Sequence, residues 1–175
     1  MKELSELIGR LACERPADWE SLPDIELYRD QVLSYMKRQH SLQPDAAQLT
    51  GAMINNYIKS GLLPRANGKK YTKDHLVYLT AICSLKQVLS VSETDELLKL
   101  QPEIADAKGF YESYLMKMEK AFRETAEQLD ESFSKEQLAA MALELAISSY
   151  AQKLVCERIL ELLEEKEPPQ KGKGK

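Results

Sequence analysis

The chain has 175 residues, of which 43% are hydrophobic and 30% charged, and its net charge is −4. This length can bury a core without disulfides or metal ions, and the low counts of seven glycines and seven prolines favour long helices over a loop-rich all-β fold. Cys13, Cys83 and Cys156 are far apart and fit reduced, mostly buried thiols rather than a disulfide framework or a zinc site. The charged N-terminus and the lack of a long apolar segment predict a soluble, cytoplasmic protein.

Positive charge is concentrated in one window of the sequence. Residues 49–90 hold six basic side chains and one acid, a net charge of +5, whereas residues 1–48 and 91–175 carry −3 and −6. Like charges repel one another, so this clustering indicates a polyanionic partner. A merely solvated face is the alternative.

Residues 1–23 are predicted to form an N-terminal arm. A short helical pattern opens it, and Trp19 and Leu22, between two prolines, are expected to pack the arm onto the body. Apolar residues at helical spacing then predict a helix over residues 25–39, with Asp24 as its N-cap.

The basic window begins with a short predicted helix over residues 52–60. Thr50 suits the N-cap of this helix, and Gly61 suits the left-handed residue that ends it. Asn67-Gly68 then indicates a two-residue β-hairpin turn, because both residues tolerate positive φ.

Thr72 is the predicted N-cap of the next helix, which continues for about 17 residues, and Ser92 is the predicted cap of a further short helix. Two long helices follow, over residues 103–130 and 134–166, the second opened by a Ser134–Gln137 capping box. Residues 168–175 are expected to be a disordered basic tail.

These elements predict a mainly helical fold with one small β-hairpin. We expect a winged helix-turn-helix domain over residues 24–100 and a C-terminal helical region over residues 101–167. In such a domain the short helix enters the DNA major groove and the basic wing reaches flanking phosphates. Asparagine can bond adenine bidentately, and lysine and arginine neutralise phosphates. The candidate DNA-binding residues are Thr50, Asn55, Asn56, Tyr57, Lys59, Arg65, Lys69, Lys70 and Tyr71.

The residues themselves resemble a known pattern. Residues 49–64, Leu-Thr-Gly-Ala-Met-Ile-Asn-Asn-Tyr-Ile-Lys-Ser-Gly-Leu-Leu-Pro, followed by Lys-Lys-Tyr-Thr-Lys-Asp-His-Leu over residues 69–76, resemble the start of a MerR-type DNA-binding domain. Residues 23–32, 53–57, 70–71 and 85–90 resemble more closely the bacterial domain-of-unknown-function 1836 family, which is considered MerR-like. The resemblance covers about residues 22–100 and implies a DNA-binding transcriptional regulator of uncharacterised function.

The chain departs from MerR regulators at the short helix. Asn55 stands where that superfamily usually has an arginine, and Asn56 replaces the first aromatic residue of its pair. The contacts of MerR proteins are therefore not transferred to these positions, and no effector pocket or inducer is indicated.

Structural roles compete with the functional ones. Tyr57 and Tyr71 could anchor the wing to the core instead of contacting phosphate, and Asn55 and Asn56 could be plain surface residues. The sequence has no phosphate loop, nucleophile elbow or metal-ligand set, so we expect neither an enzyme nor a cofactor or metal ion. The competing function is a helical adaptor whose basic surface docks a protein.

The C-terminal helices predict a homodimer. Residues 143, 147, 150 and 154 form an apolar row separate from the row of 138, 141, 145 and 155. One row can pack on the body of the same chain, and the second would then remain exposed unless another subunit covers it. Coverage of both rows within one subunit is the alternative.

Overall fold

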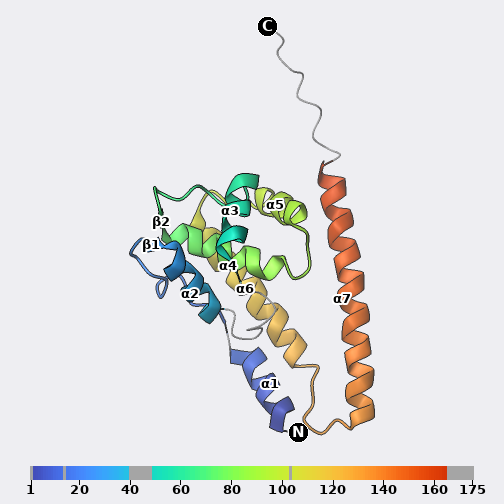
Figure 1. Cartoon of the computed structure of the whole chain (residues 1–175). Helices are drawn as coiled ribbons and strands as arrows, with labels where there is room; N and C mark the ends of the chain where they lie inside the picture. The colour runs from blue at the N-terminus through green and yellow to red at the C-terminus, as the bar shows by residue number, and fades with distance from the viewer. Residues whose placement is uncertain (1, 14, 40–48, 103, 165–175) are drawn as a thin grey trace. The chain divides into compact units, whose positions relative to one another are not determined.

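The computed structural model describes residues 2–13, 15–39, 49–102 and 104–164 (Figure 1). The fold is mainly helical, with one small antiparallel sheet among these residues. Two compact units divide the chain, Met1–Phe133 and Ser134–Lys175. The elements in chain order are α1 (Lys2–Cys13), β1 (Leu27–Tyr28), α2 (Arg29–Gln39), α3 (Gly51–Ser60), β2 (Lys70–Tyr71), α4 (Lys73–Leu85), α5 (Val91–Lys99), α6 (Ala107–Ala126) and α7 (Lys135–Glu164). The tail expected over residues 168–175 lies outside the described residues.

The segment before α2 differs from the sequence prediction. Residues 25–28 are not helical, and Asp24 caps no helix, because Leu27 and Tyr28 instead pair with β2 as an antiparallel strand. Leu27 is 7% exposed while Tyr28 is 55% exposed, so the two strand residues face opposite sides. The Tyr28 N–H donates to Gln31 Oε1 at 2.8 Å, and this bond satisfies the backbone where α2 begins.

The predicted ends of α3 are confirmed. Thr50 has extended backbone dihedrals, and its Oγ1 accepts a hydrogen bond from the Met53 N–H at 3.2 Å. Gly61 has φ +84°, a left-handed conformation that costs glycine little, and its N–H donates to the Ile58 carbonyl. The helix is therefore held to ten residues by signals at both ends.

A two-residue turn forms one residue further along than predicted, with Gly68 and Lys69 at its centre, and its strand pairs elsewhere. Asn67 and Lys70 exchange both backbone hydrogen bonds at 3.0 Å around Gly68, whose φ is +64°. Beyond this tight turn, β2 pairs with β1, with Leu27 opposite Tyr71 and Tyr28 opposite Lys70. The sheet thus joins β2 to β1, which directly precedes α2 and lies more than 40 residues earlier in the chain. Residues 65–71, which contain the turn and β2, are called the wing below.

The later helices follow the prediction with two corrections. α4 begins after Thr72 as expected but ends at Leu85, after 13 residues, where turn hydrogen bonds replace the helical ladder. α5 is capped by Ser90 rather than Ser92, because Ser90 and Glu93 form the reciprocal bonds of a capping box.

The two C-terminal helices form as predicted, but the helix predicted over residues 103–130 is shorter, because Asp106 caps the start of α6 and Glu127 its end. The capping box expected between Ser134 and Gln137 is present at the start of α7. α6 packs against α4 and α1 within the first unit.

The cysteines are less buried than predicted. Only Cys83 is buried; Cys13 is exposed and Cys156 half-buried, because both lie on helix faces that reach solvent.

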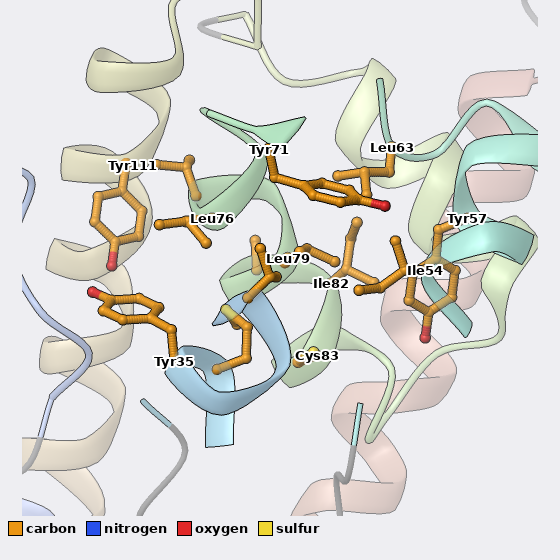
Figure 2. Packing of buried hydrophobic residues seen from close by; sticks show 14 of the residues in the cluster. Tyr35, Ile54, Tyr57, Leu63, Tyr71, Leu76, Leu79, Ile82, Cys83 and Tyr111 are labelled. Atoms are coloured by element: carbon orange, nitrogen blue, oxygen red, sulfur yellow. The ribbon is translucent and has the colours of Figure 1, made fainter. Parts of the chain in front are cut away.

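One apolar core lies between α2, α3, α4 and α6. Its centre is the inward face of α4, where Leu76, Leu79 and Ile82 are fully buried (Figure 2). The arm packs onto this core as predicted, since Leu22 is 2% exposed and Trp19 lies against the cluster. The core therefore fixes α3 and the wing relative to α2 and α4.

Candidate nucleic-acid interface

The outer face of α3 carries three exposed polar residues, Asn55, Asn56 and Lys59. Ile54 and Tyr57, on the opposite side of the same helix, are 0% and 3% exposed and belong to the core. Because the helix is anchored by its buried side, its polar side has a fixed direction. Amide groups at adjacent positions on an exposed helix face can bond to a planar polar edge such as a base.

Thr50 is part of the helix start rather than of this face. Its side-chain oxygen already accepts the Met53 N–H, so its main interaction is the cap. The cap alone explains why a threonine stands at this position, so no contact with a ligand is needed to explain it.

Arg29 is a basic residue near α3 that the sequence analysis missed. An added Cβ on Gly51 would lie 3.2 Å from Cδ and Nε of Arg29, so this side chain crosses the first turn of α3. The side chain is 52% exposed, and its Nε lies 3.8 Å from Asp30 Oδ1. Arg29 belongs to the acidic N-terminal part of the sequence, and only the packing of α2 against α3 brings it to the basic window.

The wing presents cations around the tight turn. Lys69 follows Gly68 at the turn and is exposed, as is Arg65 at its approach. The Arg65 backbone is tied to α4, because its carbonyl oxygen lies 3.4 Å from His75 Nε2. The Thr72 N–H donates to His75 Nδ1 at 3.1 Å, so Nε2 is the nitrogen that carries hydrogen toward Arg65.

Acids from residues 24–26 neutralise part of the basic window. Lys70 Nζ lies 3.5 Å from Glu26 Oε2, and Lys73 Nζ lies 2.6 Å from Asp24 Oδ1. Lys73 also lies 4.8 Å from the Trp19 ring centroid, and its side chain is only 15% exposed. The net positive charge at the surface of the folded basic window is therefore smaller than the +5 counted along the sequence.

Three basic residues of the window remain available. Within the described part of the chain, Lys59, Arg65 and Lys69 form no ion pair. Lys86 is half-buried and donates to the Leu89 carbonyl oxygen at 3.3 Å. Free cations thus lie on α3, before the turn and within it, where they can meet phosphates.

Tyr57 and Tyr71 lie in the core, at 3% and 6% exposure (Figure 2). The Tyr71 ring meets the His75 ring edge-on, with centroids 5.4 Å apart, and burial raises the pKa of the Tyr57 hydroxyl. Both rings therefore anchor α3 and the wing, which is the structural role that the sequence left open.

Neither a metal-binding cluster nor a membrane-spanning helix is present among the described residues. There, no group of three or more His, Cys, Asp or Glu side chains is placed to hold a metal ion. None of the helices in the described ranges has the length and apolar character needed to span a membrane.

Comparison with known proteins gives a match to a protein family. No curated protein and no solved structure matches the chain. One family model, described as "Domain of unknown function (DUF1836)", matches residues 17–125. The matched segment runs from the end of the arm through almost all of α6 and so contains α3, the wing and their core. The chain therefore belongs to the DUF1836 family.

Proposed function

We propose that this protein is a DNA-binding transcriptional regulator with a MerR-like winged helix-turn-helix domain. The observation that carries the proposal is the exposed polar face of α3, with Asn55, Asn56 and Lys59, beside a turn that presents Arg65 and Lys69. A capped short helix next to a basic turn suits a recognition helix flanked by phosphate contacts.

In this proposal α3 enters the major groove of duplex DNA. Asn55 and Asn56 read base edges, and Lys59, Arg65 and Lys69 bind phosphates on either side of the groove. Tyr57 and Tyr71 do not contact DNA, since the core holds their rings. Thr50 contributes by fixing the start of α3.

The test replaces two free cations at the wing. Arg65→Ala with Lys69→Ala should weaken binding to all duplex sequences alike and flatten the slope of log K against log salt by about 2, because two phosphate contacts are lost. Lys117→Ala with Lys120→Ala on α6 makes the same charge change at exposed positions and should leave the slope unchanged. An equal effect of both pairs, measured by fluorescence anisotropy, would reject the interface.

We also propose that the regulator is a homodimer formed through α7. Leu143, Ile147, Tyr150 and Leu154 recur at steps of four, three and four, and are 63%, 58%, 65% and 47% exposed. Such a row on a 30-residue helix suits pairing with the same row of a second copy. Two copies would present two recognition helices to paired half-sites.

A second candidate function, docking of a protein partner, has one observation in its favour. Ile25 and Tyr28 are 69% and 55% exposed beside Lys70, whose Nζ lies 6.0 Å from the Tyr28 ring centroid. Apolar residues next to a cation suit a protein surface better than a phosphate backbone. Retention of a partner at high salt would favour this adaptor, whereas salt-sensitive retention on duplex DNA favours the regulator.

A further inference from the structure

Glu26 bridges the two ends of the wing turn. Its Oε1 accepts a hydrogen bond from Asn67 Nδ2 at 3.2 Å, and its Oε2 lies 3.5 Å from Lys70 Nζ. Asn67 and Lys70 are also the two residues that close the turn through their backbones. A single carboxylate therefore contacts both residues that frame Lys69.

The backbone next to Glu26 holds it in this place. Leu27 follows it directly, is 7% exposed, and pairs with Tyr71, while Tyr28 pairs with Lys70. Glu26 thus directly precedes β1, whose pairing with β2 brings its backbone close to that of Lys70. The sheet therefore fixes the position of Glu26 relative to Lys70.

The ion pair itself adds little to folding. Its two side chains are 36% and 46% exposed, and exposed pairs contribute little because water and salt screen them. The same exposure leaves Lys70 able to exchange its carboxylate for a phosphate. The pair therefore bears more on ligand binding than on stability.

We propose that Glu26 limits the DNA affinity of this surface, because it withholds Lys70 from the phosphate backbone. This inference rests on the proposed function. Phosphate contacts supply the sequence-independent part of DNA affinity, and base contacts supply the sequence-dependent part. By pairing with Lys70, Glu26 lowers the first part and leaves the contacts of α3 unchanged. Duplexes of every sequence are then bound less tightly, by the same factor.

The test is Glu26→Gln, which keeps an amide oxygen for Asn67 and removes the charge that holds Lys70. Random duplex DNA should bind about eightfold more tightly at about 0.1 M salt, and the slope of log K against log salt should steepen by about 0.9, the effect of one further phosphate contact. Glu124→Gln is the matched control, because it removes the acid that lies 3.8 Å from Lys120 on α6. It should change neither quantity.

A second pair of variants assigns the effect to Lys70. In a Lys70→Ala background, Glu26→Gln should no longer steepen the slope, since the withheld cation is gone. A gain that persists there, or an equal gain from Glu124→Gln, would overturn the inference and show general charge repulsion instead. An unchanged slope in Glu26→Gln would also overturn it.

The outcomes separate this inference from the proposed function. If the unmodified protein binds DNA and Glu26→Gln does not improve binding, the regulator stands and the role of Glu26 falls. If the unmodified protein fails to bind at low salt but Glu26→Gln binds through Lys70, the proposed function falls, whereas the pairing of Glu26 with Lys70 is shown to block phosphate binding. If neither binds at low salt, both proposals fall.

Discussion

Cys83 lies in the apolar core, and its burial gives a pH dependence that can be measured. The thiol is 5% exposed, and burial raises its pKa from 9.0 to about 12. In the unfolded chain this thiol ionises as the pH rises through 9, whereas in the fold it keeps its proton. The folded state thus binds the proton more tightly than the unfolded chain does. The contribution of this thiol to the free energy of unfolding is therefore complete below pH 9 and is lost between pH 9 and about 12.

We therefore predict that the free energy of unfolding falls above pH 9, by up to about 1.4 kcal/mol per pH unit for this thiol. Cys83→Ala should make the decline of the free energy of unfolding between about pH 9 and 10 shallower. The small cavity that it leaves lowers this free energy equally at every pH, so it does not affect the slope. Cys13→Ala, at an exposed position, is the control and should keep the full decline. Urea unfolding at a series of pH values measures both. The same steepness in all three proteins would contradict the role of Cys83.

Signals that act within a few residues were readable from the sequence. The Thr50 cap, the Gly61 stop and the Ser134–Gln137 capping box depend only on neighbours along the chain, and all three form. The ion pair between Glu26 and Lys70 joins residues 44 positions apart. Nothing local in the sequence indicates that pair, so the net charge of the window overstated the free charge of the surface.

At the scale of elements, β1 shows where periodicity misleads. Ile25 and Tyr28 continue the helical spacing of α2, yet Leu27 and Tyr28 form a strand because β2 offers them backbone partners. A strand of two residues is too short to show an alternating pattern of its own. Arg29 was missed for a related reason, since only the packing of α2 on α3 places it beside Gly51.

The proposed role of α3 as a recognition helix gives a prediction about sequence preference. Asn55→Ala and Asn56→Ala should each relax preference at one base pair by about 1–3 kcal/mol, because an asparagine that reads a base loses its bidentate bond. Both side chains are exposed, so folding should change little. Duplexes selected by the unmodified protein from a random pool, compared with unselected duplexes, provide the measurement. Equal losses on both kinds of DNA would remove the asparagines from base reading.

At the scale of the whole molecule, the proposed homodimer predicts a mass. One chain weighs 19.9 kDa, so light scattering at micromolar concentration should give about 40 kDa. Ile147→Glu with Leu154→Glu should give a folded monomer with weaker DNA binding, because charges then interrupt the apolar row. Ser149→Glu, at an exposed position of the same helix, should remain a dimer. A mass of one chain for the unmodified protein would reject the dimer, and loss of folding in the double variant would place the row in the core.

The most direct test of the central claim is the salt dependence of duplex DNA binding by the unmodified protein. The free cations Lys59, Arg65 and Lys69 predict measurable binding at about 50 mM salt and a slope of log K against log salt of about −3 per protomer. Fluorescence anisotropy with a labelled random duplex, repeated over a salt series, gives this slope. Absence of binding at the lowest salt, or an affinity that does not change with salt, would contradict a DNA-binding function.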